Sequence, residues 1–242
     1  MKVLNLDIDA FVTPIALYRG PDDGRLSETD YSCWTPDRLG RYLEDHCGLS
    51  RARKTMGCIV TQHDELFPIW RSLIASGDMD ASVHLYHLDA HDDLGGGLDD
   101  ESHEEVQSRV LLKPVESRPH VPWEKMNSGN YLLYALACRW ISALTLIRHP
   151  EDFQSVPRNL LSDDGARIHL QPWSQGAPVA GASREPSIPL DVIPIDDFTM
   201  RDEFAWVFVA TSPAFTPPAA DALTEVVREY LDLTGEILGL PR

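Results

Sequence analysis

Two short runs of the sequence carry side chains that could do chemistry together. In the first run, Asp89, His91 and Asp93 are spaced two positions apart. Because successive side chains of a strand point to opposite faces, an extended backbone would place these three on one face. The second run places Asp7 and Asp9 on one face in the same way, at the end of an apolar stretch. Carboxylates and imidazoles that converge in this manner predict a metal site.

The elements that must hold these side chains have the pattern of buried strands separated by helices. Short β-rich runs of near-continuous apolar character alternate with helical patterns, which is typical of a mainly parallel sheet covered on both faces. We therefore expect an α/β fold. Strands are predicted over residues 2–9, 57–62, 82–88, 141–148, 190–196 and 206–210.

Helix signals fall between these strands. Thr35 suits the N-cap position and Pro36 the first helical position, so a helix is predicted to begin there. Further helices are predicted over residues 64–75, 130–140 and 218–233.

Two long segments interrupt the alternation. Residues 95–123 are acidic, and residues 150–189 are rich in Pro, Gly and Ser. Loops of this length in a compact domain are usually functional lids or disordered segments. Neither segment is long or apolar enough to form a domain of its own, so we expect one domain over residues 1–242.

The composition excludes several classes of partner. A formal net charge of −17 argues against nucleic acid and anionic membranes and suits a cationic ligand. No stretch approaches the ~20 apolar residues of a membrane span, and the first residues lack the pattern of a signal peptide, so we expect a cytoplasmic protein. The four cysteines have no CxxC spacing, which predicts neither a disulfide framework nor a zinc knuckle.

The acidic and histidine side chains fall where strand patterns end. In an open α/β sheet the ligand site lies at the carboxyl ends of the strands, so His63 is expected to join the two runs described above. Four carboxylates, two imidazoles and no thiolate form a hard ligand set that favours Mn²⁺, although affinity order alone does not exclude other divalent ions. Four aspartates carry too much charge for one ion, which predicts a pair of ions in each chain.

Three motifs resemble those of the arginases, agmatinases and related ureohydrolases. Residues 89–93 match the DAHxD motif of that family, and residues 6–11 resemble its second DxD strand. Residues 128–130 match the substrate-loop sequence SGN. The resemblance implies a three-layer α/β/α fold and a binuclear manganese site that hydrolyses the C–N bond of a guanidinium to give an amine and urea.

The resemblance also implies a role for each ligand. Asp7 and Asp89 would bridge both ions, and a hydroxide held between the ions would attack the guanidinium carbon. Asp89, His91 and Asp7 would thus be the catalytic residues. The remaining ligands divide between the two ions, with His63 and Asp93 on one and His91 and Asp9 on the other.

Three departures from the arginase pattern bear on the substrate. The DxD strand opens this chain, as in a circular permutant, and this order resembles the arginase-related family that includes peptide arginases, which convert arginine to ornithine within ribosomal peptide precursors. The segment 209–213 ends without the acid that arginases use to bind the guanidinium, and Tyr131 replaces the histidine that follows SGN. An arginine-containing precursor peptide is therefore the expected partner, and a homo-oligomer is possible.

Several residues have a structural interpretation beside the functional one. His63 could simply cap the following helix, while Ser128 and Asn130 could either contact substrate or cap theirs. His87 is in phase with Asp89 but lies deeper, so we interpret it as a core histidine. The nearest unassigned acids, which we expect to bind the substrate guanidinium, are Asp92 and Glu65.

Two rival functions remain open at this stage. One is a ureohydrolase or amidohydrolase that acts on a free small molecule. The other is a non-catalytic interaction protein in which the same ligands only hold a stabilising metal.

Overall fold

The computed structural model describes residues 1–20, 22–96, 100–152, 156–174, 177–179 and 185–233. Its largest element is an eight-stranded sheet. The strands of this sheet are β1 (Lys2–Asp7), β4 (Thr55–Val60), β5 (Val83–Asp89), β6 (Ile141–Arg148), β7 (Arg167–Ile168), β10 (Ile188–Pro194), β11 (Trp206–Ala210) and β12 (Leu231–Leu233). Two small antiparallel pairs lie outside it, namely β2 (Val12–Thr13) with β3 (Ser32–Cys33) and β8 (Trp173–Ser174) with β9 (Ala177–Pro178).

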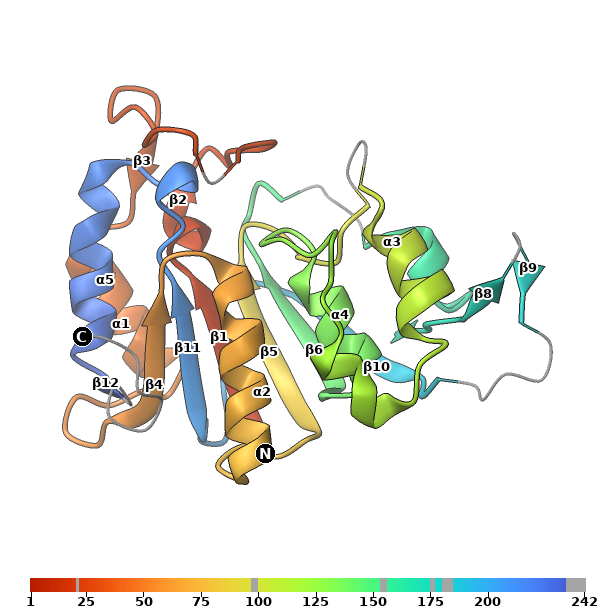
Figure 1. Ribbon diagram of the computed structural model, residues 1–242. Coiled ribbons are helices and arrows are strands. Elements are labelled where there is room, and N and C mark those ends of the chain that lie inside the picture. The colour runs from red at the N-terminus through yellow and green to blue at the C-terminus, as the bar shows by residue number, and fades with distance from the viewer. Residues whose placement is uncertain (21, 97–99, 153–155, 175–176, 180–184, 234–242) are drawn as a thin grey trace.

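The strand order is β12-β4-β11-β1-β5-β6-β10-β7 (Figure 1). Every neighbouring pair is parallel except β10 with β7. The predicted α/β class and mainly parallel sheet are thus confirmed.

Helices cover both faces of the sheet. Among the described residues the α-helices are α1 (Pro36–Asp45), α2 (Leu66–Ser76), α3 (Ser102–Glu105), α4 (Tyr131–Ala137) and α5 (Asp221–Arg228). Shorter helical turns are η1 (Ile8–Phe11), η2 (His63–Glu65), η3 (Val106–Val110), η4 (Val115–His120), η5 (Arg158–Leu160), η6 (Pro213–Phe215) and η7 (Pro218–Ala220). No helix in the described part of the chain is long and apolar enough to cross a membrane.

Two apolar clusters hold these layers together. The helices α2 and α4 lie on one face of the sheet (Figure 1), where Trp70 and Tyr131 belong to the same apolar cluster. On the other face, α1 and α5 pack through Leu39 and Leu223. Alternate residues of β1 serve the two clusters, so a strand buried on both sides explains its near-continuous apolar sequence.

The predicted start of the first helix is confirmed. The Thr35 hydroxyl accepts a hydrogen bond from the Arg38 amide at 3.2 Å, and Pro36 occupies the first helical position. The side chain thereby satisfies one of the amide groups that a helix start leaves without a partner.

The prediction of a helix over residues 218–233 is wrong at its carboxyl end. The helix stops at Arg228, and Leu231–Leu233 instead add a parallel edge strand beside β4. Gly57 of β4 permits this close approach, because a Cβ there would lie 2.7 Å from the Val207 carbonyl oxygen and 3.1 Å from Leu231. The open backbone groups of β4 offered pairing that a local helical pattern does not reveal.

The two long segments contain more structure than expected. The described part of residues 95–123 includes α3, η3 and η4, and the described part of residues 150–189 includes η5 and three short strands. Within these two segments, residues 97–99, 153–155, 175–176 and 180–184 lie outside the described residues.

A buried ion pair ties the second of these segments to the core. Arg118 donates to Glu185 at 2.7 Å and to the carbonyl oxygens of Lys113, Leu111 and Ala137, and both members of the pair are almost fully buried. Arg139 donates to the other Glu185 oxygen at 2.9 Å. Removal of the carboxylate would therefore leave a buried guanidinium without its counter-charge.

We expect Glu185→Ala to lower the free energy of unfolding by about 3–5 kcal/mol, the usual cost of breaking a buried pair from one side. Urea denaturation of the variant measures this. Glu203→Ala is the matched control, because its partner Arg53 and Glu203 itself are both exposed, and it should cost less than about 1 kcal/mol. Equal effects of the two variants would contradict a structural role for the buried pair.

Candidate metal centre

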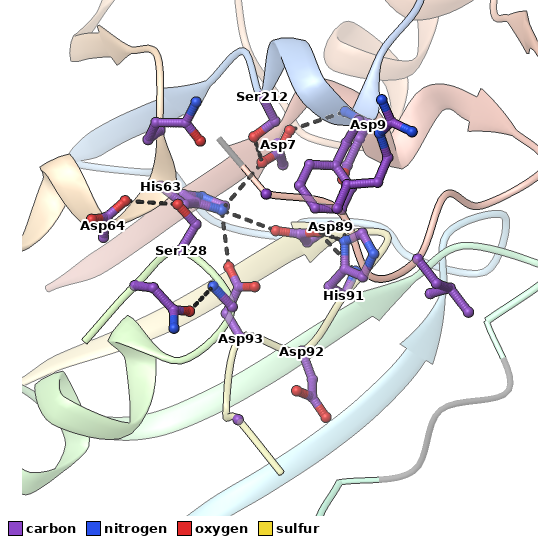
Figure 2. Close-up of a pocket in the computed structure, with 18 of the residues that line it drawn as sticks. Asp7, Asp9, His63, Asp64, Asp89, His91, Asp92, Asp93, Ser128 and Ser212 are labelled. Carbon is purple, nitrogen blue, oxygen red and sulfur yellow. Dashed lines mark hydrogen bonds and ion pairs between the residues drawn. The ribbon is translucent and has the colours of Figure 1, made fainter. Parts of the chain in front are cut away.

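The site forms where four neighbouring strands end. Asp7 and Asp89 are the last residues of β1 and β5. His63 follows β4, and Ser212 follows β11, so their side chains reach the same edge of the sheet (Figure 2). Asp7, His63 and Asp89 were expected at the carboxyl ends of parallel strands, and they meet there at one edge of the sheet.

The first ligand group surrounds His63. Its Nδ1 lies 3.3 Å from Asp7 Oδ2, 3.1 Å from Asp89 Oδ2 and 3.0 Å from Asp93 Oδ2 (Figure 2). Ligand atoms about 2.1 Å from an ion and at right angles to each other are about 3 Å apart. The three distances from His63 Nδ1 therefore match those between neighbouring ligands of one cation.

The second ligand group surrounds His91. Its Nδ1 lies 3.2 Å from Asp9 Oδ2 and 3.5 Å from Asp89 Oδ1. Asp89 thus turns one carboxylate oxygen toward each group. This shared carboxylate joins two groups that could hold metal ions, namely His63, His87, Asp89 and Asp93 in one and Asp9, Asp89 and His91 in the other. Asp7 lies beside the first group, through its contact with His63.

Unpaired buried atoms support the same conclusion. Asp89 Oδ2 and Asp93 Oδ2 are buried without a hydrogen-bond partner, as is Nε2 of His87. Buried polar atoms are nearly always paired, so a cluster of three without partners requires an explanation. A cation between the carboxylates would satisfy both oxygens.

The charges of the cluster are strongly coupled. Burial and repulsion from Asp9 and Asp89 raise the pKa of Asp7 well above its ordinary value. Burial and repulsion from Asp89 raise the pKa of Asp93 to about 7. Burial opposes ionisation of His63, but the negative carboxylates of Asp89, Asp93 and Asp7 beside it outweigh burial and raise its pKa well above normal. Without a cation the group must therefore hold extra protons.

The backbone conformation that carries His91 and Asp93 differs from the extended strand that was expected. The strand β5 ends at Asp89, and His91 and Asp93 follow in a turn in which Asp93 has a φ of 51°. The Asp89 carboxylate accepts the His91 amide at 2.8 Å, and Asp7 accepts the Asp9 amide at 3.0 Å in the same way. These bonds between a carboxylate and the amide two residues later hold the chain in a turn. The prediction that an extended strand places the ligands on one face is therefore wrong for His91 and Asp93.

Each histidine of the two groups is oriented from behind. His91 Nε2 lies 2.9 Å from the Ala16 carbonyl oxygen, and His63 Nε2 lies 3.0 Å from Asn5 Oδ1. Each contact needs a proton on Nε2, so Nδ1 is the nitrogen that faces the carboxylates and that offers a lone pair once the ring is neutral. Such outer partners are typical of histidines that bind metals.

The expected substrate residues divide into two kinds. Ser128, Asp92 and Glu65 line the cavity above the ligand groups. The Glu65 oxygens, however, accept the amides of Thr61 and Gln62, so this carboxylate caps the turn that carries His63.

Asn130 and Asp92 are likewise engaged by the backbone. Asn130 is buried and bonds to the backbone of Lys125 and Asn127, which fixes the loop before α4. One Asp92 oxygen accepts the Leu94 amide at 3.0 Å, and burial raises the pKa of Asp92. These contacts give both side chains a local structural role.

Four further residues were not singled out as site residues from the sequence. Asp64 accepts the Ser128 hydroxyl at 2.7 Å on the cavity wall, and Ser212 donates to Asp7 Oδ2 (Figure 2). Asn5 is buried behind His63. His87 is buried as expected, but it lies close enough to His63, Asp89 and Asp93 to count among the residues that could hold a metal. For Asn5 a signal was present, because it shares the strand face of Asp7.

The ligand groups form the floor of a cavity of about 590 Å³. Its walls carry Asp64, Glu65, Asp92 and Asp100, whereas Arg19 is the one lysine or arginine among the described lining residues. The Arg19 guanidinium donates to the carbonyl oxygens of Ala214 and Gly24. The cavity therefore favours a cationic group.

Metal affinity should rise with pH. Because the pKa of Asp93 is raised to about 7, this acid holds a proton below that pH, and an incoming ion must displace it. Each displaced proton changes the binding constant by about tenfold per pH unit, so Mn²⁺ should bind more weakly at about pH 6 than at about pH 8. Competition with a chelating dye measures this, and a binding constant that is the same at both pH values would contradict the expectation.

Comparison of the chain with protein-family models and with curated proteins found no match.

Proposed function

We propose that the chain is a binuclear manganese hydrolase that converts peptidyl arginine to peptidyl ornithine and releases urea. The observation that carries the proposal is the position of Asp89, whose two oxygens face two separate ligand groups at the floor of an acidic cavity. The resemblance of residues 6–11, 89–93 and 128–130 to ureohydrolase motifs supports the choice of reaction.

The residues present fit two hard divalent ions. Asp89 would contribute to both ions, with His63 and Asp93 on one side and His91 and Asp9 on the other. For Asp7, which the resemblance makes a second bridge, the contacts support a place on the His63 side, because Oδ2 lies 3.3 Å from His63 and Oδ1 accepts the Asp9 amide. Oxygen predominates in this set and no thiolate is near, which suits Mn²⁺. When bound, a pair of such ions lowers the pKa of a shared water and so supplies a nucleophile near neutral pH.

Other groups of the protein orient the ligand side chains and attract the substrate. Ser212 donates to Asp7 and fixes that carboxylate, while Asn5 and the Ala16 carbonyl fix the two imidazoles. The acidic wall, with Asp64 held by Ser128, attracts the guanidinium. In the net reaction one water adds to the guanidinium carbon, the bond from that carbon to Nε breaks, and Nε leaves as the ornithine amine.

The cavity also supports a substrate whose carboxylate is not free. A free amino acid needs a cation for its α-carboxylate, and Arg19 is the one lysine or arginine among the described lining residues, where four acidic side chains also line the walls. An arginine within a peptide has no such requirement, and its neighbouring residues add binding surface outside the cavity.

The proposal is tested by incubating the manganese-loaded protein with arginine-containing peptides and following ornithine by mass spectrometry and urea by a colorimetric assay. We expect both products in equal amounts, and their loss after chelation. Urea from free arginine alone would indicate the small-molecule enzyme. No product from a protein that holds its metal would indicate the non-catalytic alternative.

A further inference from the structure

One buried amide contacts both histidines of the first ligand group. Asn5 and His87 are partners in the register of β1 and β5, so their side chains lie side by side behind the ligand atoms. Asn5 Oδ1 lies 3.0 Å from Nε2 of His63, and Asn5 Nδ2 lies 3.2 Å from Nδ1 of His87. The same Nδ2 donates to the Tyr131 hydroxyl. All of these side chains are fully buried, so water does not substitute for any contact.

An amide has one acceptor side and one donor side, which restricts its two neighbours. The Asn5 oxygen requires a proton on Nε2 of His63, and this leaves the Nδ1 lone pair toward the carboxylates. The Asn5 nitrogen requires a lone pair on Nδ1 of His87, so the proton of that ring lies on Nε2. His63 therefore presents a lone pair on Nδ1 to the site, whereas His87 presents an N–H group on Nε2.

Turning the amide over does not remove this restriction. Nδ2 would then face Nε2 of His63, and the proton of that ring would move to Nδ1, where it would block the lone pair. One amide oxygen cannot face both rings, so only one of the two histidines can offer a lone pair to an ion. The distances favour His63, because its Nδ1 is within 3.3 Å of three carboxylate oxygens, whereas Nε2 of His87 is 3.4 Å from Asp89 and 3.7 Å from Asp93.

We propose that Asn5 selects His63 as a metal ligand and holds His87 with its Nε2–H group facing the carboxylates of Asp89 and Asp93. His87 is then a positioning residue for the bridging carboxylate and not a third imidazole ligand. The arrangement keeps one nitrogen in an otherwise oxygen-rich group, which disfavours ions that prefer several nitrogens. The inference rests on the metal-binding role proposed for His63.

The tautomers can be read directly by NMR. Protein labelled with ¹⁵N-histidine and loaded with Zn²⁺, a diamagnetic substitute for Mn²⁺, would be measured by long-range ¹H–¹⁵N correlation, with His87→Gln and His63→Gln used for assignment. We expect zinc on Nδ1 of His63 and, for His87, a proton on Nε2 with a free Nδ1. A proton on Nδ1 of His87, or zinc on its Nε2, would overturn the inference while the metal centre stands. Absence of bound zinc would overturn both.

Two variants give an independent measurement. Asn5→Leu keeps a similar shape but removes the acceptor behind His63, so Mn²⁺ affinity should fall about 10–100-fold, as for other outer partners of ligand histidines. His87→Gln keeps an N–H donor and should retain two Mn²⁺ per chain. Loss of one ion from His87→Gln would show that His87 is a ligand and would overturn the inference. His84→Gln, on the same strand, is the matched control and should change neither quantity.

Discussion

Asp89→Asn is expected to abolish urea release and to reduce bound manganese from two ions per chain to one at most. An asparagine has one oxygen, so it could serve the His63 group or the His91 group, whereas Asp89 faces both. Metal-assisted catalysis supplies several kcal/mol of transition-state stabilisation, and its loss corresponds to about 10³-fold or more in rate.

The controls separate this effect from misfolding. Asp191→Asn makes the same change on an exposed position of β10 and should leave rate and metal content unchanged. Circular dichroism of both variants without metal checks that the fold is kept, and both spectra should match that of the parent. Near-native turnover by Asp89→Asn would mean that this carboxylate does not join two ions.

Peptidyl arginine should be turned over at least about 100-fold more efficiently than free arginine or agmatine, measured as kcat/KM. Binding of residues remote from the guanidinium can hold it in place for the reaction, and a 100-fold gain corresponds to about 2.7 kcal/mol. Free arginine would gain nothing from that surface. Its α-carboxylate would moreover enter a cavity whose walls are mainly acidic.

A graded substrate series makes this test sharp. Arginine blocked at both ends removes the terminal charges without adding a peptide, so its kcat/KM should lie between those of free arginine and the peptide. Tyr18 lines the cavity and is 84% exposed. A substitution there tests the contribution of the peptide residues around the arginine. Tyr18→Ala should lower kcat/KM for the peptide and not for blocked arginine. Equal efficiency on free arginine would assign the chain to the small-molecule ureohydrolases.

Much of the site could be predicted from the sequence because its ligands follow strands. Apolar runs located β1, β4 and β5, and polar residues at their ends had to share one edge of a parallel sheet. His91 and Asp93 were predicted as neighbours of Asp89 from the alternation of side chains along a strand. They do lie near Asp89, but in a turn that follows the strand. A turn and a strand can bring the same residue types to one point, and spacing alone does not separate them.

Other features depend on contacts between distant segments and are not visible in local patterns. Glu65 caps a turn because its carboxylate accepts the amides of Thr61 and Gln62. The residue type alone does not distinguish this role from substrate binding. The contact of His87 Nδ1 with Asn5 depends on the pairing of β1 with β5, which places these two residues side by side. The edge strand β12 formed because β4 had an open edge, while its own sequence continued a helical pattern.

The central claim is that each chain holds two hard divalent ions, and metal analysis tests it most directly. The protein would be stripped with a chelator, reconstituted with Mn²⁺, freed of excess metal and measured for manganese and protein by elemental analysis. The shared position of Asp89 between the His63 and His91 groups predicts two manganese ions per chain. One ion per chain, or none, would contradict the binuclear centre.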